Sequence, residues 1–369
     1  MVLVPIETPV EIPSEGLRQD RSAVSTATQR RVAVIGCGVC SPAAHSAKEL
    51  VNLLTAREPQ RARPVKQLLA REELDNASGL GVRESKKVDR FSLLALAAAR
   101  RALRDAGLKS DAVRHCGIVS GNMMAGWTFT EPQLRALHAL GLGAVSPYLA
   151  TAWFPAAPQG QVTIHLNMQG FAKTVTTDQS AGAQAIGMAF ERIRDHRADL
   201  LLAGGVEAPV TPFVQAALTQ LGEGPGDLAE AAAFILLSTA DGGCPAIGAH
   251  TTFPLPCSES FPAEVIVRQI AAFLHELPDR PPVQTAVCNV AADLRIEEEI
   301  ASIVRKAVHG AEPRLFFPMR AIGNCLGASS AIAAVVAYEV LSQATAPCSA
   351  LVLSVGHQCG DLLWMYRWS

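Results

Sequence analysis

The segment around Gln179 has the residue types of a sharp strand-to-helix turn that presents one side chain to a cleft. Gln179 and the preceding Asp178 follow a run of β-formers: Thr174, Val175, Thr176 and Thr177. Such a turn aims free backbone N–H groups and a helix dipole at its apex, which lowers the pKa of a nucleophile placed there. Glutamine has no ionisable proton and forms no acyl ester or thioester, so Gln179 cannot be that nucleophile.

The elements that position this turn alternate between buried strands and helices, which predicts an α/β protein. Before it, strands are expected at 32–36 and 117–121, and helices at 47–54 and 89–105. After it, strands are expected at 200–205, 234–237, 285–288, 314–317 and 350–354, and helices at 263–274, 296–308 and 328–341. Since the pattern restarts near Ala246, we predict two pseudo-duplicated halves, 31–241 and 242–369, after a flexible N-terminal extension, 1–30.

Composition excludes several classes of function. The chain has 369 residues, of which 49% are hydrophobic, and it carries 32 basic against 34 acidic residues, so a nucleic-acid partner is not expected. Residues 1–29 lack the apolar run of a secretory signal, and no segment is apolar enough to cross a membrane, which predicts a cytoplasmic protein without a membrane partner. We find no dinucleotide or P-loop motif, and we expect no cofactor and no metal.

The nine cysteines favour reduced thiols because their number is odd and no secretory signal precedes them. Cys37 and Cys40 have the spacing of a redox or metal pair, but no second pair completes a site. We interpret them as two small residues at a strand-to-loop junction.

Several motifs resemble one family. The run that starts Asp89-Arg90-Phe91 is similar to the first helix of β-ketoacyl synthases, and residues 204–209 resemble the strand and turn after their nucleophile helix. Residues 145–148, 152–157 and 160–164 resemble one branch, the chain-length factors, or ketosynthase β-subunits, of type II polyketide synthases. The resemblance implies the thiolase fold, with two five-stranded sheets in a five-layer αβαβα arrangement, working as a dimer.

Active members of this family use a cysteine that takes the acyl chain from an acyl carrier protein, and two histidines that assist decarboxylation of the malonyl extender. The cysteine corresponds to Gln179. The second histidine corresponds to Asn324, because residues 323–328 match the Gly-His-x-Leu-Gly-Ala frame, and the first falls on Asn289 in a poorer match. A lysine before the second histidine corresponds to Met319. The resemblance therefore implies that none of these positions is catalytic.

Two functions fit this pattern. One is a non-catalytic chain-length subunit that forms a heterodimer with an active β-ketoacyl synthase and works on acyl carrier protein through that complex, in polyketide or polyene synthesis. The other is a stand-alone malonyl-thioester decarboxylase or initiation ketosynthase that uses Gln179. Such enzymes keep the histidines, and losing one donor of that kind typically costs roughly 10²–10³ in rate. This favours the first function, although asparagine can still donate a hydrogen bond.

The resemblance also assigns positions for assembly and chain length. The strand Thr174–Thr177 is expected to pair with its counterpart across the dimer axis. The tunnel plug is expected at Trp127, Thr130 and Leu134, where larger side chains shorten the cavity. The alternative is that Trp127 and Leu134 are core residues and that Thr130 is the N-cap of a helix, since Thr130 to Gln133 has the form of a capping box.

The remaining candidates are weaker. His357, in a glycine-rich loop, is the imidazole expected near the cleft. Ser180 beside the turn suggests a hydrolase, but the local sequence is not Gly-x-Ser-x-Gly. Cys288 and Cys325 are expected to be buried, unreactive thiols. Residues 221–233 are shorter than the corresponding segment of the family, which suggests a trimmed subtype and puts a carrier-docking site on this chain in doubt.

Overall fold

The computed structural model describes residues 30–56, 67–220, 228–239, 243–256, 261–277, 280–290, 294–308 and 312–368. The expected N-terminal extension therefore lies outside the described residues apart from Arg30, and so do residues 221–227 of the shortened segment. In the part of the chain that is described, no helix is both long and apolar enough to cross a membrane.

Ten strands lie side by side in the order β3-β2-β4-β5-β1-β6-β10-β9-β7-β8. Their bounds are β1 (Val32–Cys40), β2 (Gly117–Asn122), β3 (Ala172–Thr176), β4 (Leu200–Glu207), β5 (Ala231–Ser238), β6 (Ala246–Pro254), β7 (Val283–Asn289), β8 (Arg314–Phe316), β9 (Cys348–Val355) and β10 (Cys359–Arg367). Two sets of five are joined where Val32 pairs with Ile247 and Ala33 with Ala246, so hydrogen bonding continues from one set to the other.

The two sets have the same internal topology. When the strands of each set are numbered in chain order, both sets have the order 3-2-4-5-1 across the sheet. The first set is β3-β2-β4-β5-β1, and the second is β8-β7-β9-β10-β6. In each set the second strand is parallel to the third and fourth, and the fifth is antiparallel to the fourth and first. The predicted duplication is therefore confirmed in both order and direction.

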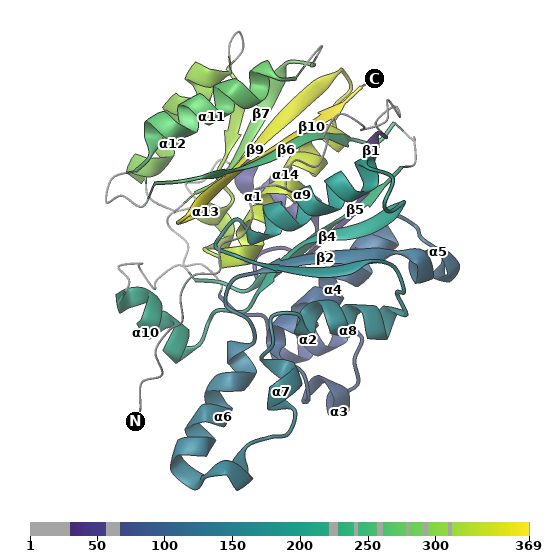
Figure 1. Ribbon diagram of the computed structural model, residues 1–369, viewed down its shortest axis with the longest axis vertical. Helices are drawn as coiled ribbons and strands as arrows, with labels where there is room; N and C mark the ends of the chain where they lie inside the picture. Colours follow the sequence, from purple (N-terminus) through teal and green to yellow (C-terminus); the bar gives the residue numbers. More distant parts are fainter. Residues whose placement is uncertain are drawn as a thin grey trace, which may run out of the picture.

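Helices form three layers around these sheets (Figure 1). On the outer side of the first half lie α2 (Arg71–Ser78), α4 (Arg90–Asp105) and α8 (Ala157–Leu166), and on the outer side of the second half lie α11 (Ala263–His275) and α12 (Leu294–Ala307). Between the halves lie α9 (Ala181–Arg194), α14 (Ser329–Ser342) and α1 (Ala47–Thr55), whose apolar residues share one buried cluster with the inner faces of the strands. This is the five-layer αβαβα arrangement of the thiolase fold.

The first part of the connection from β2 to β3, which precedes α8, projects from the body as a lobe at the bottom of Figure 1. It contains α6 (Trp127–Leu140), the 3₁₀ turn η3 (Leu142–Ala144) and α7 (Leu149–Ala152). The short helices elsewhere are α3 (Val82–Ser85), α5 (Ser110–His115), α10 (Pro212–Gln220), α13 (Met319–Ile322) and the 3₁₀ turn η5 (Leu326–Ala328).

Helix α6 begins at Trp127, with Gly126 as its N-cap, so Thr130 lies inside the helix and the capping-box interpretation of Thr130 is wrong. The reason is a contact distant in sequence: Asp89, whose side chain caps α4 by accepting from Phe91 N at 2.9 Å, also accepts from Phe129 N at 2.6 Å in the first turn of α6. The Thr130 hydroxyl instead donates to the Gly126 carbonyl at 2.6 Å. Pro132 consequently lies inside the helix.

Candidate functional site

Gln179 lies at the apex of the turn between β3 and α9, as the sequence predicts. Its Nε2 lies 3.0 Å from Nε2 of His357, on the loop that joins β9 and β10, so the contact connects the two halves. If the amide donates, the imidazole carries its proton on Nδ1. Gln179 Oε1 is buried and finds no partner among the described residues. The apex thus holds an amide, which forms no acyl ester or thioester, beside an imidazole.

Asp178 organises the turn below the apex. Its Oδ1 accepts hydrogen bonds from the Ser180 backbone N–H at 2.9 Å and from the Ser180 hydroxyl at 2.6 Å, and its Oδ2 accepts from Gln358 N at 3.1 Å. Burial by itself raises the pKa of Asp178, but the hydrogen bonds from Ser180, Gln358 and Cys359 outweigh it and lower the pKa overall. A carboxylate held ionised here disfavours a second negative charge at the apex.

Ser180 is not placed to act as a hydrolase nucleophile. The residue is fully buried, and its hydroxyl donates directly to Asp178 rather than to an imidazole. Since a serine nucleophile needs a base that takes its proton and a path for the substrate, the hydrolase interpretation has no geometric support.

A buried polar network continues from the turn into the second half. Gln184 Nε2 donates to Ser180 Oγ at 2.9 Å and to Cys359 Sγ at 3.1 Å, and it lies 3.4 Å from Asp361 Oδ2. Asp361 Oδ1 is 2.9 Å from Nε2 of His250. Burial, followed by the charges of Asp178 and Asp361, raises the pKa of the Cys359 thiol to about 11. The thiol closest to the apex in this network is therefore not activated.

The two positions that the resemblance assigns to histidines, 289 and 324, carry asparagine amides. Asn289 ends β7, is buried, and its Oδ1 has no partner among the described residues. Asn324 lies between α13 and η5, where its Oδ1 accepts from Leu326 N at 2.9 Å. Met319, which the resemblance places at the lysine position, is buried at the start of α13. The side-chain oxygen of Asn324 is thus already used to cap the following turn.

Burial also explains the thiols near these positions. Cys288 and Cys325 are buried, as predicted, and burial raises the pKa of Cys288 to about 12.

Trp127 and Leu134 line a groove of about 690 Å³ between α6 and α10. The Trp127 ring stacks on Phe213 with centroids 4.6 Å apart and planes 21° apart. Glu131 links α6 to α10, because its carboxylate accepts a hydrogen bond from Phe213 N at 3.1 Å. The same carboxylate also accepts from Arg135 on its own helix. The structure brings Trp127 and Leu134 to one surface, whereas Thr130 is not among the lining residues.

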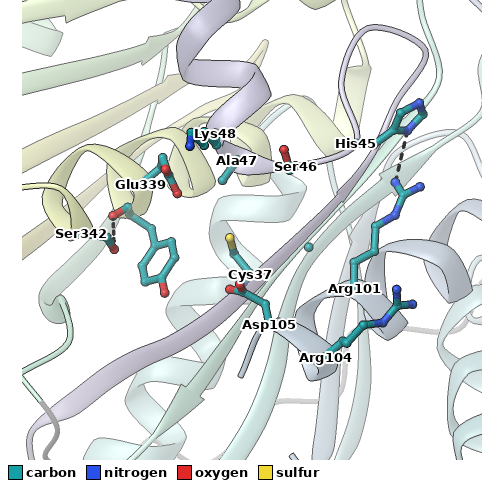
Figure 2. Close-up of a pocket in the computed structure, with 12 residues that line it drawn as sticks. Cys37, His45, Ser46, Ala47, Lys48, Arg101, Arg104, Asp105, Glu339 and Ser342 are labelled. Atoms are coloured by element: carbon teal, nitrogen blue, oxygen red, sulfur yellow. Dashed lines mark hydrogen bonds between the residues drawn. The ribbon is translucent and has the colours of Figure 1, made fainter. Parts of the chain in front are cut away.

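A second hollow, of about 630 Å³, lies among β1, the start of α1 and the ends of α4 and α14 (Figure 2). Arg101 bonds to His45 at 3.3 Å in this hollow, and Asp105 accepts from the Cys37 backbone N–H at 2.9 Å. Burial raises the pKa of Cys37 above its ordinary range. None of the groove or turn residues lines this hollow.

Cys37 and Cys40 do not form a pair. Both belong to β1, which continues to Cys40 rather than ending at Gly36, so the expected junction lies four residues too early. Cys37 packs in the central hydrophobic cluster and Cys40 in the outer one, because residues three apart in a strand point to opposite faces. In the part of the chain that the structure describes, no cluster of acidic, histidine and cysteine side chains could hold a metal.

The strand that leads into the turn is a sheet edge. Among the described strands, β3 pairs only with β2, and Ala172, Lys173, Thr176 and Thr177 are exposed. Large apolar side chains are also exposed on the adjoining lobe and on α8: Leu137, Leu140, Leu142, Tyr148, Trp153, Phe154 and Ile164. An unpaired edge beside exposed apolar side chains is typical of a protein interface.

Comparison with known proteins gives a family match and several curated relatives. The family model described as the N-terminal domain of beta-ketoacyl synthase matches residues 29–234. Among curated relatives, the putative polyketide beta-ketoacyl synthase 1 of Streptomyces halstedii is 32% identical over 207 residues, which are 51% of this chain and 48% of that protein. The putative polyketide beta-ketoacyl synthase 2 of Streptomyces cyaneus is 34% identical over 132 residues, 34% of this chain and 31% of that protein. The matches thus span about a third to a half of these relatives.

Solved structures share the fold over most of the chain. A type II polyketide synthase complex of an acyl carrier protein with its ketosynthase, bound to the hexaketide, contains a chain that matches with a TM-score of 0.77 and 24% identity. The ishigamide ketosynthase/chain length factor matches with a TM-score of 0.74 and 18% identity. Each match covers 92% of this chain and 100% of the other. At these identities the similarity establishes the thiolase fold of the ketosynthases.

Proposed function

Because the chain belongs to the β-ketoacyl synthase family, we propose that it is a non-catalytic chain-length subunit that pairs with an active β-ketoacyl synthase. In that complex it shapes the tunnel in which a polyketide or polyene chain, carried by an acyl carrier protein, is extended. One observation carries the proposal. The apex of the turn holds Gln179, with its amide against His357, where the family places its nucleophile.

The chemistry of the site supports an inactive role. Decarboxylative condensation needs a nucleophile that forms a thioester and N–H donors that stabilise the developing enolate. Gln179 cannot form the thioester, and Asn324 and Asn289 stand at the two histidine positions. With a carboxylate of lowered pKa, Asp178, below the apex and a protonated thiol, Cys359, beside it, no neighbouring group substitutes for the missing cysteine.

The surface supports a partner. The β3 edge offers unpaired backbone groups for an antiparallel strand of a second subunit, and the exposed apolar side chains on the lobe and α8 extend that surface. Pairing at β3 would place the Gln179 turn, which directly follows this strand, beside the partner subunit's corresponding turn.

The groove at Trp127 supports control of chain length. It is apolar on the side of Trp127, Leu134 and Phe213, which suits an acyl chain, and the stacked rings give it a rigid wall. The Streptomyces relatives are named as polyketide beta-ketoacyl synthases, and polyketides are one class of product proposed for the complex.

The proposal is tested by co-expressing the chain with a ketosynthase that retains the cysteine and both histidines. We expect a 1:1 complex, products whose length depends on this chain, and acyl groups on the partner's cysteine only. A Gln179→Ala variant is the matched control, and it should support the same condensation as the original chain. Failure to form a complex, or products that do not depend on this chain, would contradict the proposal.

A second candidate is a malonyl-thioester decarboxylase, which the 3.0 Å contact of Gln179 with His357 favours because it places an amide donor and an imidazole at one apex. It predicts release of carbon dioxide from malonyl carrier protein by this chain alone, and loss of that activity in Gln179→Ala. Comparing the original chain with Gln179→Ala therefore distinguishes the two functions.

A further inference from the structure

Glu207 is a buried carboxylate that the sequence does not single out and that the proposed chemistry does not use. It ends β4 and has no exposed surface. Among the described residues, no lysine, arginine or histidine forms an ion pair with it. A carboxylate buried without a cation is costly, so its surroundings need to supply hydrogen bonds.

Three backbone N–H groups supply them. Glu207 Oε2 accepts from Met123 N at 2.7 Å and from Gly327 N at 3.3 Å, and Oε1 accepts from Met124 N at 3.1 Å. Burial raises the pKa of Glu207 to about 8, although these three donors favour the charged form. One side chain thus joins two segments that are about 200 residues apart in the chain.

The first of these segments leads directly into the groove. Met123 and Met124 follow β2, and α6 begins three residues later at Trp127 after Ala125, whose φ is +63°, and Gly126. Met123, Met124 and Trp127 pack against one small hydrophobic cluster, which consists of Val214, Leu218, Leu228 and Leu326. The position of the two methionine amides therefore helps to determine where α6 and its tryptophan lie.

The second segment follows Asn324. At Gly327 an added Cβ would lie 2.8 Å from Met123 N and 2.9 Å from Glu207 Oε2, so the backbone approaches both too closely for any side chain. The glycine is required because the carboxylate fills the space between the segments. We propose that Glu207 is a positioning residue, which fixes the start of α6 against the Asn324–Gly327 segment and thereby sets the size of the chain-length groove.

This inference rests on the proposed function for its effect on products, but its structural part can be tested independently. The Glu207→Gln variant keeps the volume and the carbonyl oxygen but turns an NH₂ group toward one of the backbone donors. Glu230→Gln is the matched control, because Glu230 is equally buried in the same half but bonds to Arg90 and Leu69 N instead.

The first measurement is the amide spectrum of the full chain labelled with ¹⁵N-methionine, which gives few signals because the chain has seven methionines. We expect Glu207→Gln to move the Met123 and Met124 signals and to speed hydrogen exchange at one of them roughly tenfold, because one buried backbone N–H loses its acceptor. The Met168 and Met365 signals serve as internal references and should stay in place. Unchanged Met123 and Met124 signals, or an equal effect of Glu230→Gln, would overturn the positioning role.

The second measurement is product length in the complex with the partner ketosynthase. At equal amounts of complex, we expect Glu207→Gln to broaden the distribution of product chain lengths. Glu230→Gln should at most lower the yield of product. A distribution unchanged by Glu207→Gln, despite moved amide signals, would overturn the link to the groove. If the original chain has no influence on product length, the proposed function fails, and the amide spectrum still decides whether Glu207 positions α6.

Discussion

Replacing Trp127 with alanine tests the groove as a wall for a growing chain. Trp127 is half-buried and stacked on Phe213, so the change removes part of the groove's wall without touching the Gln179 turn. A fully buried tryptophan replaced by alanine costs about 3–5 kcal/mol of stability, and half burial reduces this to about 2 kcal/mol. The variant should therefore stay folded while its groove is larger.

The expected effect on products follows from burial of the added chain. Each additional CH₂ that enters an apolar space gains about 0.8 kcal/mol, which corresponds to about a fourfold change in a ratio of products. Relief of crowding against the ring adds to this, since forcing extra atoms into a packed wall costs about 1–3 kcal/mol. Trp127→Ala should thus raise the ratio of the next longer product to the original one at least about fourfold.

The assay is mass-spectrometric measurement of product lengths made by the complex, with thermal unfolding measured on the same preparations. Val82→Ala is the control, because Val82 is 63% exposed on α3 and belongs neither to the groove nor to the exposed apolar surface of the lobe and α8. It should leave the product ratio as it is. Equal product lengths for the original chain and for Trp127→Ala, at equal amounts of complex, would refute the groove as the determinant of length.

Three further changes test the account. Gln179→Cys should yield no condensing enzyme, since each missing imidazole donor costs roughly 10²–10³ in rate, and elongation of an acyl group on that cysteine would contradict this. Gly356→Ala should lower the free energy of unfolding, measured by denaturant titration, by about 1–3 kcal/mol, because the new Cβ would lie 2.2 Å from Asp178 Oδ2. Gly143→Ala is the control and should leave the free energy of unfolding unchanged, because its Cβ meets nothing within 4 Å. The free energy of unfolding should fall as pH rises from about 4.5 to about 8. The reason is that burial raises the folded-state pKa of Glu207 to about 8, so the unfolded chain binds fewer protons in that window. If Glu207→Gln keeps the same dependence of the free energy of unfolding on pH, Glu207 is excluded as its source.

The sequence predicts most of the fold because its strands and helices are strongly patterned. The helix from Arg90 to Asp105, capped by Asp89, is found where the pattern places it. The sequence pattern does not predict β6 and β10. In β6 the burial pattern is irregular, and its pairing with β10 and β1 comes from parts of the chain that no local window contains.

The candidate site is predictable only where a single residue type carries the information. Gln179 predicts a turn without a nucleophile at its apex, and its contact with His357 agrees with the expectation that this imidazole lies near the apex. The network of Asp178, Ser180 and Cys359, and the role of Glu207, depend on hydrogen bonds between distant segments. Thr130 shows the same limit, since its capping signal is overridden by Asp89 from another helix.

The central claim, that this chain assists a partner's chemistry without performing its own, is tested most directly by intact-mass measurement of both subunits. The complex is exposed to malonyl and acyl carrier protein, and the mass of each subunit is followed with carbon dioxide release. The account predicts acyl groups on the partner ketosynthase and an unchanged mass for this chain, with no carbon dioxide released by this chain alone. An acyl group on this chain, or decarboxylation without the partner, would contradict it.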